Sequence, residues 1–122
     1  MWAGEGRLRV CLSAAQVGED LVVTIGGGEI PHVGSVAVAV PRPSLRDREV
    51  TSATASVVTL VGHKDDELAK PISEFLAARL RRTVVVVAGV HVDCATSDDI
   101  EILSDAAWEL ARELCETIGR NE

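Results

Sequence analysis

Three histidines, two of them followed closely by a carboxylate, are the residues of this chain best suited to chemistry. His63 stands two residues before Asp65, His91 stands two residues before Asp93, and His32 lies in a separate loop-like stretch. Neutral imidazoles and carboxylates together bind borderline divalent ions such as zinc, manganese or iron. The spacing matches no metalloprotease or zinc-finger signature, so an ordinary role in turns and caps is the competing interpretation.

Covalent catalysis is the weaker hypothesis. Ser13, Ser52 and Ser56 are available as nucleophiles, but none stands in a nucleophile-elbow sequence. Cys94 directly follows Asp93, and a thiol beside such polar groups could be reactive. A buried and inert cysteine is the more common state of this residue type, and we favour it.

The valine-rich stretch Thr83–Ala88 predicts the strand that positions His91 and Asp93. Four consecutive valines between a threonine and an alanine are typical of a strand buried on both faces. In an extended segment, residues two apart point to the same side, so the imidazole and the carboxylate should emerge together. Ligands of open α/β sheets bind beyond the carboxyl ends of the strands.

A second strand and a helix precede the valine strand. Residues 54–61 are mostly apolar, and large apolar residues then recur at helical spacing. Strand, helix and strand form a β-α-β unit whose two strands should be parallel. The unit would therefore place the Gly62–Lys64 segment next to the Gly89–Asp93 segment, with His63 beside His91.

The remaining pattern predicts three more strands and a long C-terminal helix. Arg7–Ala14 and Leu21–Ile25 should pair as a hairpin, and Ser35–Val40 is apolar on both faces. Thr96 and Asp99 have capping-box spacing at the start of the last helix. The predicted fold class is α+β: a single five-stranded mixed β-sheet with two helices and one parallel β-α-β crossover.

Two loops have compositions that suit a ligand. Gly26–Gly28 would let a ligand approach the main chain closely, although its spacing excludes the dinucleotide fingerprint and a flexible turn is the alternative. The connection Pro41–Ser52 is long and polar and contains three arginines. It is a candidate lid or phosphate-binding loop, but solvated charge is the interpretation that we prefer.

Composition narrows the classes of partner. The chain has 122 residues and a net charge of −7, which predicts a single domain over residues 1–122 and argues against nucleic acid, whose phosphates need a basic surface. No apolar run reaches the roughly 18 residues of a membrane span, and the N-terminus lacks a signal-peptide core. Three cysteines without a short spacing are typical of reduced thiols in the cytoplasm.

Three motifs, in this order, carry a resemblance to a known family. They are Gly-Gly-x-x-Pro-His-Val-Gly at residues 27–34, Gly-His-Lys-Asp-Asp-Glu-Leu-Ala at residues 62–69, and Ala-Gly-Val-His-Val-Asp-x-Ala-Thr at residues 88–96. With them the chain resembles the LpdD-type prenylated-flavin chaperones, small proteins that accompany UbiD-type decarboxylases. The resemblance spans nearly the whole chain. At position 94 the motif leads us to expect Asn, and Cys94 puts a role for that side chain in doubt.

The resemblance implies a homodimer that holds prenylated flavin mononucleotide (FMN) and passes it to a UbiD-type decarboxylase, with a divalent metal ion as an optional contact to the phosphate. It implies a non-enzymatic role. The cofactor-binding positions that it implies are Gly27, Gly28, His32, His63, Lys64, Asp65, His91 and Asp93. The candidate metal ligands among them are His32, His63, His91 and Asp93.

Two other functions stay open. A small metal-dependent enzyme could use His63, His91 and Asp93 around a bound water. A purely structural assembly chaperone could instead bind a larger partner through a dimer face. The metal content and the visible absorption of the purified protein would separate these possibilities.

Overall fold

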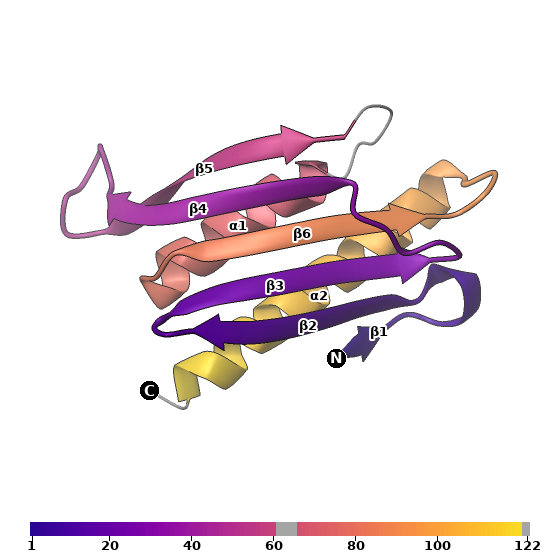
Figure 1. Ribbon diagram of the computed structural model, residues 1–122, viewed down its shortest axis with the longest axis horizontal. Coiled ribbons are helices and arrows are strands. Elements are labelled where there is room, and N and C mark those ends of the chain that lie inside the picture. Colours follow the sequence, from indigo (N-terminus) through magenta and orange to yellow (C-terminus); the bar gives the residue numbers. More distant parts are fainter. Residues whose placement is uncertain (61–65, 121–122) are drawn as a thin grey trace.

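The computed structural model describes residues 1–60 and 66–120, which form one mixed sheet and two long helices (Figure 1). The strands are β1 (Trp2–Ala3), β2 (Val10–Val17), β3 (Asp20–Gly28), β4 (Ser35–Pro43), β5 (Thr51–Thr59) and β6 (Val84–His91). The helices are α1 (Asp66–Leu80) and α2 (Ser97–Arg120), and a short 3₁₀ helix, η1 (Gly6–Leu8), precedes β2. In space the strands follow the order β1-β2-β3-β6-β4-β5.

The sheet has six strands, so the predicted number of five was wrong. The additional strand is β1, in which Trp2 pairs with Cys11 and Ala3 pairs with Val10. The sequence could not reveal it, because two residues are too few to show the alternation that identifies a strand. The predicted α+β class is correct, and so is the hairpin of β2 and β3.

Strand β4 lies between the two strands of the expected β-α-β unit. It pairs antiparallel with both β5 and β6, so β5 and β6 run in the same direction without being neighbours. Ser35 of β4 pairs with Thr59 on one side and with Ala88 on the other. The hydrogen-bonded parallel pair is β3 and β6, with Gly28 opposite His91. The two carboxyl ends therefore reach the same edge, as predicted, but a third strand separates them.

Both helices cover the same face of the sheet (Figure 1). Helix α1 packs against β4, β5 and β6, and α2 packs against β1, β2 and β3. The layer between sheet and helices contains fully buried aliphatic side chains, among them Leu12, Val23, Ile72, Val86 and Leu110. Burial of such side chains is the main source of stability for this arrangement. No helix in the described ranges is long and apolar enough to cross a membrane.

The start of α2 is fixed by the capping box that the sequence predicted. Thr96 N donates to Asp99 Oδ2 and Asp99 N donates to Thr96 Oγ1, both at 3.1 Å. Each bond satisfies a main-chain amide that the first helical turn leaves without a partner. The guanidinium of Arg7 also reaches Asp99 Oδ2, at 3.2 Å. The beginning of α2 is thereby attached to the segment that precedes β2.

The opposite face of the sheet carries no helix among the described residues. The side chains that point to it alternate with those of the core, and on β6 and β4 most of them are valines. We call this surface the open face and define it by Val22, Val36, Val38, Val40, Val58, Val85 and Val87. Val38 is 38% exposed and Val58 is 68% exposed, so the face is apolar and accessible.

Candidate functional site

His32 and His91 come together where β3 and β6 end. Their ring centroids are 6.5 Å apart and their planes are inclined by 77°. His91 is the last residue of β6, and His32 lies in the loop between β3 and β4. Because β3 and β6 are parallel neighbours, with Gly28 opposite His91, the loop that leaves β3 starts beside the end of β6.

Main-chain hydrogen bonds hold this loop against β6. The amides of Glu29 and His32 donate to the carbonyl groups of His91 (2.8 Å) and Gly89 (3.3 Å). A side chain at Gly89 would collide with the His32 carbonyl group, and one at Gly28 would collide with that of His91. Gly28 also has a φ angle of +75°, which other residues rarely adopt. These glycines allow two segments of chain to touch; a ligand contact at Gly27 or Gly28 stays a prediction.

Two carboxylates complete the cluster. His91 Nε2 and Asp93 Oδ1 are 2.9 Å apart, so this ring nitrogen donates to the carboxylate. His32 Nδ1 is 3.0 Å from the Ile30 carbonyl oxygen, which can only accept. Asp93 N donates to Glu29 Oε1 at 3.0 Å. We call the side chains of Glu29, His32, His91 and Asp93 the histidine rim.

Within the described residues, the histidine rim does not form a metal site. In residues 1–60 and 66–120, no three His, Cys, Asp or Glu side chains come close enough to share an ion. Asp93 already accepts a hydrogen bond from His91 Nε2, and the His32 ring is 6.5 Å from the His91 ring. The geometry suits a ligand that hydrogen-bonds to separate imidazoles better than it suits an ion that needs converging donors.

Three predicted cofactor positions, His63, Lys64 and Asp65, lie outside the described residues. The predicted contact between His63 and His91 therefore stays a prediction. The structure does bring a histidine to His91, but it is His32. Sequence reasoning missed this pair because it assigned β5, and not β3, as the parallel neighbour of β6.

The predicted lid lies elsewhere. Residues 41–43 and 51–52 continue the ladder between β4 and β5, so only residues 44–50 connect the two strands. Arg42 Nε donates to Thr54 Oγ1 at 2.6 Å within this hairpin. β4 begins at the edge that carries His91 and runs away from it, so the hairpin connection lies at the opposite edge of the sheet.

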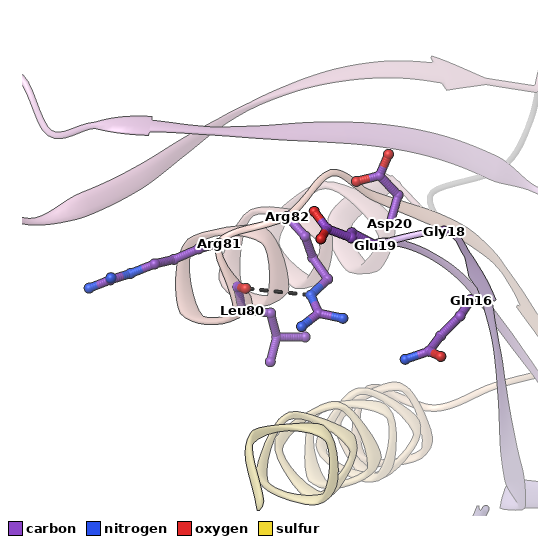
Figure 2. A pocket seen from close by; sticks show the side chains of 7 residues that line it. All are labelled: Gln16, Gly18, Glu19, Asp20, Leu80, Arg81 and Arg82. Atoms are coloured by element: carbon purple, nitrogen blue, oxygen red, sulfur yellow. Dashed lines mark hydrogen bonds between the residues drawn. The ribbon is translucent and has the colours of Figure 1, made fainter. Parts of the chain in front are cut away.

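A hollow of about 500 Å³ also lies at that opposite edge, between the β2–β3 turn and the end of α1 (Figure 2). Arg82 Nε donates to the Leu80 carbonyl oxygen at 3.5 Å, and Arg81 points away from the other labelled side chains (Figure 2). The lining contains two arginines and two carboxylates, so its formal charge is balanced, and it contains no aromatic ring. The residues that line it are Gln16, Gly18, Glu19, Asp20, Leu80, Arg81 and Arg82.

The protein-family model described as the prenylated flavin chaperone LpdD-like domain matches residues 4–119 of the sequence. The chain belongs to this family. The matched range of the LpdD-like domain contains the whole histidine rim and leaves out β1. This agrees with the resemblance that the three sequence motifs carry.

Comparison with solved structures supports the fold of the LpdD-like domain. A chain from a chaperone complex for yeast 20S proteasome assembly superimposes with a TM-score of 0.56. The alignment covers 95% of this chain and 90% of that chain, at 12% sequence identity. At this identity the similarity shows a shared fold and nothing about the ligand. The search of curated proteins found no match.

Proposed function

We propose that this LpdD-like protein binds prenylated FMN at the histidine rim and passes it to a UbiD-type decarboxylase. The observation that carries the proposal is the family match over residues 4–119. The position of the rim supports it, because His32 and His91 stand together at the carboxyl edge of β3 and β6, where sheets of this kind bind ligands. The His91 side chain is 48% exposed, so a ligand can reach it.

In the imidazolium form, the second N–H of His91 and of His32 is a suitable donor for the phosphate oxygens and ring carbonyl groups of a flavin, while His91 Nε2 and His32 Nδ1 keep their bonds to Asp93 and Ile30. The chain carries a net charge of −7, so a phosphate needs such local donors to offset the repulsion. In the proposal, Lys64 and the amides at the start of α1 provide further phosphate contacts. In this proposal a divalent metal binds only if His63 supplies a ligand in addition to those of the histidine rim. Elemental analysis of the purified protein tests that condition.

We also propose that two copies form a homodimer through the open face. Its valines carry no charge, so two acidic chains can approach there without bringing carboxylates together. The four strands that carry the open face, spaced by about 4.8 Å and each open over about six residues of 3.3 Å, give roughly 400 Å² of projected area per copy. Side-chain relief makes the accessible area larger than this projection. The accessible area of the open face thus approaches the smallest areas of stable interfaces, about 600 Å² per partner.

Titration of the purified protein with prenylated FMN tests the binding step. We expect His91→Ala to weaken binding by about tenfold or more, since a hydrogen bond to a charged group is lost. Asp93→Asn should weaken it less, because the imidazole remains but loses its carboxylate partner. Asp105→Asn, on the exposed surface of α2, is the matched control and should bind like the wild type. Equal affinity of all four proteins would refute the site.

The delivery step needs a second measurement. Apo-decarboxylase should gain activity faster from the loaded LpdD-like protein than from the same concentration of prenylated FMN in buffer. We place this exchange in the cytoplasm, because Cys11, Cys94 and Cys115 are all free thiols. Identical activation rates from both sources would argue against a delivery role.

A structural assembly chaperone is the second candidate. The shared fold with a chain of a proteasome assembly chaperone complex and the accessible open face favour it. This function predicts that flavin-free protein raises the soluble yield of the decarboxylase, and that His91→Ala does so equally well. The cofactor-delivery proposal predicts that His91→Ala fails to raise cofactor occupancy.

A further inference from the structure

An exposed tryptophan lies on the helix-free side of the sheet, at the same end as the histidine rim. In β1, Ala3 pairs with Val10 and packs against the core, whereas Trp2 pairs with Cys11 and points to the other side. Trp2 is 62% exposed. The chain has two other aromatic residues, and they pack against each other between the helices, with ring centroids 5.6 Å apart. Trp2 is thus the aromatic surface that a planar ligand can reach.

A cation is held at this indole. The guanidinium carbon of Arg9 lies 4.0 Å from the centroid of the Trp2 ring, a distance typical of a cation–π contact. The carbonyl group of Arg9 accepts a hydrogen bond from Gly28 N at 2.9 Å. Gly28 in turn pairs with His91. Arg9, which directly precedes β2, therefore forms one row with Gly28 of β3 and His91 of β6, and the middle residue has no side chain. Two strand spacings separate Arg9 from His91, about 10 Å between α-carbons.

The loop after β3 fills the space between the two groups. A Cβ added to Gly26 would lie 3.2 Å from Pro31 Cβ, so Pro31 lies over the strand neighbour of Cys11. The two carboxylates of the histidine rim already accept hydrogen bonds, Glu29 from Asp93 N and Asp93 from His91. An indole, a guanidinium and two imidazoles thus share one face and one edge of the sheet.

We propose that Trp2 and Arg9 form a binding element for the flat ring and the negative charge of the flavin. The inference rests on the proposed function and extends its site to Arg9 and to Trp2, which precedes the matched residues 4–119. The isoalloxazine stacks on the indole, which has the size and polarizable surface for such contact. The Arg9 guanidinium pairs with the phosphate, whose oxygens its planar fork of donors fits. This placement replaces the phosphate contacts from Lys64 and the start of α1, because α1 covers the other face of the sheet under β4, β5 and β6.

Tryptophan fluorescence tests this element, because the chain contains one tryptophan at the site and one away from it. Trp108→Phe leaves Trp2 as the reporter, and Trp2→Phe leaves Trp108. Titrated with prenylated FMN, the Trp108→Phe protein should lose more than about half of its emission, since stacked rings quench each other at contact distance. The Trp2→Phe protein should retain most of its emission. Circular dichroism of both variants confirms that the fold is intact.

Affinity gives a second readout. Trp2→Ala should raise the Kd for prenylated FMN by about three- to tenfold, the range for loss of one aromatic pair. Arg9→Ala should raise it by about tenfold. Arg7→Ala removes the same charge from the same segment but breaks only the contact to Asp99 (3.2 Å), and should leave the Kd within about twofold of wild type.

The outcomes separate this inference from the proposed function. If wild-type protein binds prenylated FMN and His91→Ala weakens it, while Trp2 emission and the Kd of Trp2→Ala stay unchanged, the inference is wrong and the proposed function stands. If wild-type protein does not bind prenylated FMN at all, both fail. If Trp2→Ala loses only transfer to the decarboxylase, Trp2 contacts the enzyme and the stacking role is overturned.

Discussion

The imidazole of His32 lies edge-on to that of His91, with ring centroids 6.5 Å apart, although 58 residues separate them along the chain. The contact exists because β3 and β6 are parallel neighbours whose carboxyl ends coincide. It also needs the loop after β3 to touch the main chain of β6.

Replacing Gly89 by alanine should displace the loop that carries His32 and thereby disrupt the histidine rim. The added methyl group would collide with the His32 carbonyl group, so the loop must move away from β6. We expect the free energy of unfolding to fall by more than about 2 kcal/mol, measured by urea denaturation, with weaker binding of prenylated FMN. Gly119→Ala is the control, because no described atom outside its own helical turn lies within 4 Å of the added Cβ. A helical Gly→Ala change should raise stability by up to about 1 kcal/mol.

A charge placed in the middle of the open face should separate the proposed dimer. Val38 is 38% exposed, so a lysine there fits the isolated subunit but cannot be buried without a partner charge. We expect Val38→Lys to sediment as a monomer under conditions in which the wild type is a dimer. Ile102→Lys changes another exposed apolar residue, 45% exposed and located on α2, and should stay dimeric. A dimeric Val38→Lys protein would exclude this interface.

Two buried serines should respond differently to replacement by alanine. Ser35 and Ser73 are both fully buried, but only the Ser73 hydroxyl donates to a carbonyl oxygen, that of Lys70, at 2.8 Å. Ser35 Oγ has no hydrogen-bond partner among the described residues. Removing it should therefore raise the free energy of unfolding by about 1 kcal/mol, while Ser73→Ala should lower it or leave it unchanged. A clear loss of stability in Ser35→Ala would show that the hydroxyl has a partner.

The cysteines should differ in their rates of alkylation. Burial raises the pKa of the Cys115 thiol; the positive charge of Arg79 opposes this shift and the negative charge of Glu116 adds to it. A raised pKa means that less of the reactive thiolate is present at a given pH. At pH 8, iodoacetamide should therefore modify Cys115 more slowly than the exposed Cys94, as followed by mass spectrometry. In urea the two rates should converge, and a fast Cys115 in the folded protein would contradict the assignment.

Local signals in the sequence predicted much of the fold because they act over short distances. The β2–β3 hairpin follows from two alternating segments around a glycine turn. The capping box of α2 depends on two residues three positions apart, Thr96 and Asp99. The sequence motifs also identified the family that the match over residues 4–119 shows.

The order of strands was not accessible in this way. Nothing local indicates that β4 enters between β5 and β6, because the residue pattern of a strand identifies its buried face but not its neighbours in the sheet. The predicted neighbours His63 and His91 came from the simpler β-α-β topology. In the sequence, Gly28 and Gly89 indicated that two main-chain segments approach each other closely. The positions of the glycines along the chain did not tell which segments these are.

Alone, the sequence determined where most strands and helices run and which family the chain resembles, and it pointed to the histidines and their neighbouring carboxylates as candidates for the chemistry. Only the tertiary structure decided that His91 meets His32, that the pairing of β1 with β2 places Trp2 beside Arg9, and that one face of the sheet carries no helix among the described residues. The reason is physical: periodicity and capping are short-range interactions, whereas strand pairing depends on how whole segments pack into one core. Contacts between residues far apart in the chain appear only when that packing is complete.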